Sequence, residues 1–194
     1  MNISSRFSGS AAIFGGIVWV VSDLLQSQTA EGNRAVLGLT EGNYRAILNP
    51  ALLLIALGLF GLYRVHKSRL NTLGLIGFWV TGMSLTAWLI GNVLEYGLFG
   101  VFWLVVGWIV VIVAILGISI GQVLLGFEFL KAKLLAPWSR SLPIIMGALS
   151  LAGFFIRNPG MFFFYFGIGW ILLGYALWSY ETVLSGNPAH QSTE

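Results

Sequence analysis

Residues 99–126 read FGVFWLVVGWIVVIVAILGISIGQVLLG, an apolar stretch without a charged side chain. A helix of about 20 apolar residues crosses the roughly 30 Å hydrocarbon core of a bilayer, so this stretch is long enough to span it. Sustained hydropathy of this kind is the primary sequence signal of a transmembrane helix. The stretch therefore indicates a helical membrane protein, and lipid is taken as the main solvent of the chain.

The rest of the sequence repeats this pattern. Hydrophobic residues make up 57% of the chain and charged residues 9%, whereas a soluble domain carries about 25% charged residues. We predict spans at Ser10–Ser27, Ile47–Val65, Leu73–Leu94, Phe99–Gly126, Leu142–Ile156 and Gly160–Tyr180. The expected fold class is an all-α polytopic membrane bundle of about six transmembrane helices, with residues 1–184 as a single domain and 185–194 as a flexible polar tail.

The middle of the chain resembles two helical hairpins in tandem. Leu57-Gly58 leads through basic residues to Gly74, and Leu116-Gly117 leads in the same way to Gly147. This similarity indicates either a weak hairpin repeat or the shared composition of apolar spans with basic loops.

Some local signals concern helix ends. Asn49-Pro50 and Asn158-Pro159 each place a capping residue before a proline, which predicts two helix starts. Residues 28–46 form a long connector, expected to be an interfacial lid or a short surface helix. The long fourth span is expected to tilt or to project as an amphipathic extension over Gln122–Phe129, carrying Glu128.

The basic residues are distributed unevenly between the loops. Arg6, Arg64, Lys67, Arg69, Lys131, Lys133 and Arg140 fall on one predicted side, and Arg34, Arg45 and Arg157 on the other. The positive-inside rule then predicts that both termini are cytoplasmic, in a multi-pass protein of a bacterial inner membrane. These cations form no continuous basic face, so nucleic acid is not an expected partner despite the net charge of +3.

Small residues at helical spacing predict where helices approach closely. Ala12 and Gly16 share one stripe, and Gly117 and Gly121 form a GxxxG pair. Small residues let helix backbones meet in a membrane, where burial of leucine against lipid-like leucine gains little. These residues indicate either packing within the bundle or a docking face for another membrane subunit or a second copy of the chain.

Polar residues inside the spans gather near the side opposite the termini. Asp23 lies within the first span, where a charged carboxylate costs up to about 2.5–3.5 kcal/mol if it reaches the bilayer centre. The predicted cluster near Asp23 consists of Gln26, Asn49, Asn92, Glu95 and Arg157. Trp88, also within a span, needs a partner for its indole N–H, which a bound ligand could supply. We interpret the cluster as a candidate site for a lipophilic small molecule or an ion; the alternative is a set of interface residues near water.

The sequence carries no recognisable catalytic motif. The absence of cysteine excludes thiol chemistry, and two histidines are too few for a His-rich metal site, so neither a metal nor a cofactor is expected. The chain is therefore interpreted as non-enzymatic, an accessory or structural subunit of a membrane assembly. The six spans, small-residue first helix and long first outer loop also resemble the substrate-binding subunits of energy-coupling-factor vitamin transporters, which would imply a binding or transport module. A lipid- or isoprenoid-modifying enzyme is the third interpretation.

Overall fold

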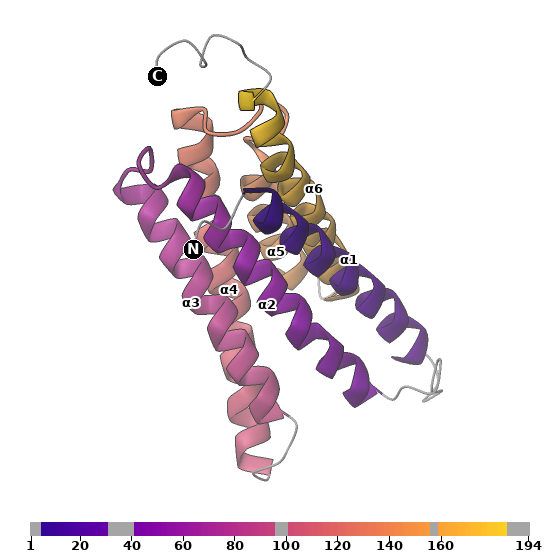
Figure 1. Ribbon diagram of the computed structural model, residues 1–194. Helices are drawn as coiled ribbons and strands as arrows, with labels where there is room; N and C mark the ends of the chain where they lie inside the picture. Colours follow the sequence, from indigo (N-terminus) through magenta and orange to yellow (C-terminus); the bar gives the residue numbers. More distant parts are fainter. Residues whose placement is uncertain (1–4, 31–40, 96–100, 156–158, 186–194) are drawn as a thin grey trace.

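The computed structural model describes residues 5–30, 41–95, 101–155 and 159–185. Within these ranges the side chains of 26–30, 41–46, 95, 101, 154–155, 159–163 and 180–185 are outside the description. The described chain forms six helices: α1 (Ser5–Ala30), α2 (Glu41–His66), α3 (Thr72–Glu95), α4 (Val101–Ala132), α5 (Leu142–Phe155) and α6 (Pro159–Ser185). The predicted all-α bundle is confirmed (Figure 1).

Four of the helices are long and apolar enough to cross a membrane, judged by length and composition. Their apolar parts are Ser5–Leu25, Ile47–His66, Thr72–Leu94 and Phe102–Ala132. The other two helices contain shorter apolar segments, Leu142–Gly153 and Phe164–Ser179. Large hydrophobic side chains also cover the outside of the bundle, Phe102 and Met83 among the most exposed. Such a surface suits contact with lipid tails, because no soluble domain would leave so much apolar area in water.

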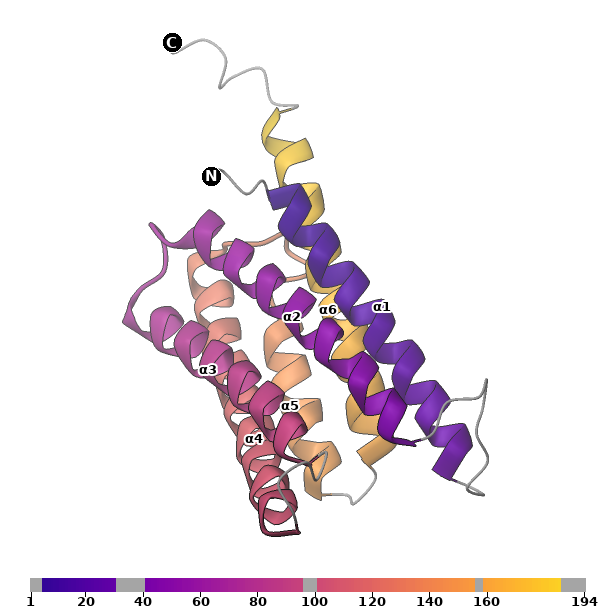
Figure 2. The same ribbon diagram turned by 60° about the horizontal axis from the view of Figure 1, so that its bottom comes forward.

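The helices run antiparallel to their neighbours in sequence, so the start of α1 and the end of α6 lie at the same end of the bundle (Figures 1 and 2). This end also carries every lysine and arginine whose side chain is described: Arg6, Arg64, Lys67, Arg69, Lys131, Lys133 and Arg140. We call it the basic end and the other one the opposite end.

The two helix starts predicted from Asn-Pro pairs differ in the structure. The prediction of a helix start at Asn49-Pro50 is wrong, because α2 already begins at Glu41 and Pro50 lies inside it. Pro50 lacks a backbone N–H and so removes one hydrogen bond of that helix, a defect that a long helix tolerates in a membrane bundle. The start predicted at Pro159 is confirmed as the first residue of α6.

Close backbone contacts join α1 to both α2 and α6. A Cβ atom added at Gly16 would lie 2.6 Å from the carbonyl oxygen of Gly167, and one added at Gly58 would lie 2.5 Å from the Cβ of Ala12. Gly9 and Gly174 make a similar contact further along the α1–α6 pair, toward the basic end. Because no side chain separates the backbones, α1, α2 and α6 form one tightly packed group, called here the first half.

The same kind of contact joins α3, α4 and α5. A Cβ atom at Gly77 would lie 2.9 Å from the carbonyl oxygen of Gly121, and one at Gly91 would lie 3.1 Å from that of Gly107. On the other side of α4, a Cβ atom at Gly147 of α5 would lie 2.5 Å from the carbonyl oxygen of Ser119. These helices form the second half.

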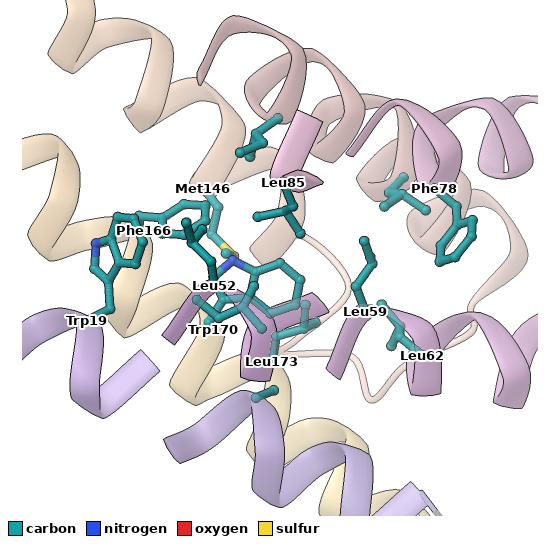
Figure 3. Packing of buried hydrophobic residues seen from close by; sticks show 14 of the residues in the cluster. Trp19, Leu52, Leu59, Leu62, Phe78, Leu85, Met146, Phe166, Trp170 and Leu173 are labelled. Carbon is teal, nitrogen blue, oxygen red and sulfur yellow. The ribbon is translucent and has the colours of Figure 1, made fainter. Parts of the chain in front are cut away.

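The two halves meet through side chains. Along the boundary between α2 and α3, Tyr63 stacks on Phe78 with ring centroids 4.3 Å apart, and a Cβ atom at Gly82 would find its nearest neighbour, a Leu59 methyl, at 3.9 Å. Between α5 and α6 the contact at Gly169 is made by the Met146 side chain. We call this boundary the seam; Figure 3 shows Leu59 of α2 and Phe78 of α3 on either side of it.

The two hairpins of the suggested repeat, α2–α3 and α4–α5, are packed differently. In the second hairpin, α4 and α5 meet with a glycine backbone in contact at Gly126 and at Gly147. In the first hairpin, α2 and α3 meet across the seam, through the larger side chains. The two hairpins therefore differ in how they are packed, and the hairpin similarity remains a sequence observation.

Candidate functional site

Aromatic rings from both halves pack against one another in the interior of the bundle, across the seam. Trp19 of α1 meets Trp88 of α3 edge to face with ring centroids 5.1 Å apart, and Phe166 of α6 lies 5.0 Å from Trp19. Trp170 continues the layer one turn along α6, 6.2 Å from Phe166. All of these rings are buried, and they form an aromatic floor to which both halves contribute. Figure 3 shows Trp19, Phe166 and Trp170 of this floor.

The predicted polar residues lie directly beyond this floor, toward the opposite end. Asp23 follows Trp19 by four residues on α1, and Asn92 follows Trp88 by four residues on α3. Residues four apart share a helix face about one turn apart. Because α1 and α3 run in the same direction and their tryptophans touch, Asp23 and Asn92 each stand one turn above the floor on the faces that turn toward the seam.

A hydrogen bond ties this polar layer together across the seam. The side-chain amide of Asn92 donates from Nδ2 to Oδ1 of Asn49 at 2.8 Å, which links α3 to α2. Buried amides in a membrane interior need such partners, because hydrocarbon offers none. The prediction that Asn49 and Asn92 belong to one cluster therefore has a direct contact to support it.

Asp23 belongs to the same layer by the register of α1 against α2. Gly15 lies against Ala51 and Ile55, so Asp23, two turns further along α1, reaches the level of residues 43–47 on the antiparallel α2. That level lies between about half a turn and two turns from Asn49. The side chain of Asp23 is 9% exposed, and its carboxylate has no hydrogen bond or ion pair within the part of the chain that the structure describes.

The remaining predicted site residues fall partly outside the description. Trp88 belongs to the floor, as part of the Trp19 contact. Glu95 is the last residue of α3, with its side chain outside the described residues, and Arg157 lies outside them altogether. The placement of these two residues in the cluster stays a prediction.

The small-residue stripes contact helices of the same chain. Ala12 and Gly16 lie against α2 and α6, as described above, and on α4 a Cβ atom at Gly117 or Gly121 would meet Ser84 or Thr81 of α3. The interpretation of these residues as a docking face for another subunit stays a prediction.

Buried polar residues near the basic end are not recognisable from the sequence. The expected amphipathic extension over Gln122–Phe129 is wrong, because the side chains of Gln122 and Glu128 are both 2% exposed. Oε1 of Glu128 accepts a hydrogen bond from the backbone N–H of Asn71 at 3.3 Å, and Oδ1 of Asn71 caps α3 by accepting from Leu73 at 2.9 Å. The signal that could have found Glu128 is the helix stripe that it shares with Gly117 and Gly121, which faces α3.

The chemistry available to these residues is limited. Among the described residues no group of three or more His, Asp or Glu side chains is placed to hold a metal ion. Asp23 and Glu128 lie near opposite ends of the bundle, so they do not form a paired acid and base. No protein-family model, curated protein or solved structure matches this chain, so the assignment rests on the geometry of the site.

Proposed function

We propose that this protein is a membrane-embedded binding module for a small molecule held in the polar layer of Asp23, Asn49 and Asn92. The observation that carries the proposal is a buried carboxylate, without a partner among the described residues, at about the same level of the bundle as an amide pair that joins the two halves. Polar groups of this kind are costly inside a membrane and mark ligand sites by default.

The layer has the composition of a ligand site rather than of helix packing. Asp23 supplies a hydrogen-bond acceptor with a negative charge in its ionised form, and the two asparagines supply both donors and acceptors. The buried aromatic floor limits how deep a ligand reaches and offers an apolar surface beneath it. This combination fits an amphiphilic molecule of modest size, with a polar group at the layer and an apolar part beside it.

This function takes precedence over the accessory-subunit interpretation for a structural reason. The small-residue stripes that suggested docking to another subunit are in contact with helices of the same chain at Ala12, Gly16, Gly117 and Gly121. Asp23 of the polar layer, in contrast, makes no hydrogen bond or ion pair within the described part of the chain. The accessory-subunit interpretation stays a prediction for other faces of the molecule.

The test is to identify what the protein carries when it is released gently from its own membrane. Native mass spectrometry of the intact protein is expected to show an added discrete small-molecule mass, which Asp23→Asn removes. Ser22→Ala is the matched control, because Ser22 is also buried and its hydroxyl donates to the Val18 carbonyl of its own helix at 2.7 Å. A bare chain, or an adduct that survives in Asp23→Asn, would contradict the proposal.

A further inference from the structure

The contacts across the seam are of a different kind from those inside each half. Its contacts are made by side chains, whereas the contacts inside each half place backbone against backbone at Gly16 and Gly77. Shear and rigid-body movements in proteins take place at boundaries between packed bodies, where side chains slide and repack. The expected line of movement in this molecule is therefore the seam.

The seam also buries polar atoms that have no partner. Both polar atoms of the Gln122 side chain, from the second half, and the indole nitrogen of Trp170, from the first half, lack a hydrogen-bond partner among the described residues. Gln122 shares a helix stripe with Phe129, which contacts His66 of α2 with ring centroids 5.9 Å apart, so this stripe faces the seam. An unsatisfied buried polar group costs about 1–3 kcal/mol, a cost that is removed when water or a polar molecule reaches it.

These groups lie between the polar layer and the basic end. Met146 of α5 contacts Gly169 beside Trp170, and the next residue, Gly147, lies against Ser119 and Val123 of α4, which bracket Gln122. The order along the seam is thus the polar layer, the aromatic floor that ends in Trp170, the unpartnered amide of Gln122, and then the pair of Tyr63 and Phe78. Polar groups are therefore present on both sides of the floor.

We propose that the two halves separate along the seam at either end in turn, so that the protein carries its ligand across the membrane instead of only holding it. This inference rests on the proposed binding function. In the described state the rings of the floor are buried and in contact, and the Tyr63–Phe78 stack lies toward the basic end. Opening on that side would wet Gln122 and Trp170 and release the ligand there.

The absence of cysteine in the sequence allows a direct test with single thiols. Leu52 and Ala51 are neighbours on α2, both 0% exposed, but Leu52 lies on the seam stripe of Asn49 and Leu59 while Ala51 lies against Gly15 of α1. Leu52→Cys and Ala51→Cys are labelled with a membrane-impermeant maleimide, in sealed vesicles of each orientation. The two positions are equally buried. Reagent reaches Leu52→Cys when the seam opens, but it reaches Ala51→Cys only when α1 separates from α2.

The proposal expects the seam thiol to react from both faces of the membrane, about tenfold faster than the control, which corresponds to an opening free energy lower by about 1.4 kcal/mol. Equal, slow labelling of both thiols would overturn the proposal that the protein is a carrier. Labelling of Leu52→Cys from one face alone would overturn it too, and would leave a binding module that does not transport. Leu85→Cys, equally buried on the α3 side of the seam, repeats the test with Ala12→Cys as its control in case one variant fails to fold.

The two proposals fail separately in these experiments. Loss of the ligand adduct in Asp23→Asn concerns the polar layer and does not require the seam to open. Two-sided labelling of the seam thiols without any bound small molecule would support the movement and contradict the assigned site. A retained, Asp23-dependent ligand with an unreactive seam would keep the binding function and exclude transport.

Discussion

The interior of each half and the seam between them are both apolar, but they are built from different residues. Within the halves, glycine and alanine bring helix backbones together, as at Gly16 against Gly167 and Gly77 against Gly121. Across the seam, contact depends on larger side chains such as Trp19, Trp88 and Tyr63. The small residues determine which helices move as one body, and the large ones determine where a ligand and a movement can be accommodated.

The largest expected effect comes from one substitution made in both regions. Gly16→Ala and Gly77→Ala place a methyl group against backbone atoms, the nearest at 2.6 and 2.8 Å, and should lower the free energy of unfolding by about 1–3 kcal/mol through overpacking. Gly82→Ala at the seam finds its nearest atom at 3.9 Å and should leave stability unchanged or raise it by up to about 1 kcal/mol. Thermal unfolding in detergent, followed as loss of monodisperse protein, measures all three variants. Equal losses of stability in Gly16→Ala and Gly82→Ala would contradict the claim that the halves are packed more tightly than the seam.

A smaller effect on stability is expected at Asn71, which caps α3 at the basic end of the second half. Asn71→Ala removes the cap of α3 and should destabilise the protein by about 1 kcal/mol, whereas Asn71→Gly should cost only a few tenths. The cap lies within the second half, and both variants keep the Asn71 backbone N–H that donates to Glu128 of α4, so neither should change labelling of the seam thiols. A change in seam labelling would show that the loop between α2 and α3 controls the seam.

The smallest effect belongs to the amide pair that crosses the seam. A double-mutant cycle with Asn49→Ala and Asn92→Ala should give a coupling energy of about 0.6 kcal/mol, because hydrogen bonds between membrane helices are weak when the separated helices find other partners. Unfolding measurements on the two single variants and the double variant supply the cycle. A coupling above about 2 kcal/mol would mean that this bond locks the halves together and would argue against easy opening.

The helices themselves can be predicted from the sequence, because hydropathy alone specifies spans in a bilayer. The helix ends cannot be predicted with the same accuracy. Asn49-Pro50 has the pattern of a helix start although Pro50 lies inside α2, since the polar residues before it continue the helix. A proline signals an end to a soluble helix more reliably than to one that is supported by neighbouring membrane helices.

The candidate site is predictable in part for a similar reason. Asp23, Asn49 and Asn92 are recognisable as costly polar residues near one end of the spans, and Asn49 and Asn92 do make contact. The buried positions of Gln122 and Glu128 are not recognisable, because a long apolar span with polar residues near its end looks like an exposed extension when the partner helix is unknown. Which helix faces are buried depends on tertiary packing, and single-sequence periodicity is weak when nearly every residue is apolar.

Distances between spin labels would test the two halves most directly, again in the cysteine-free chain. Leu57 of α2 is exposed and serves as a common label site, paired with exposed Phe14 of α1 in the same half or with exposed Val113 of α4 in the other. Pulsed electron paramagnetic resonance in lipid should give one narrow distance distribution for the pair within the first half and a broad or two-component distribution for the pair across the seam. Distributions of equal width would contradict the account, because the six helices would then move as a single body.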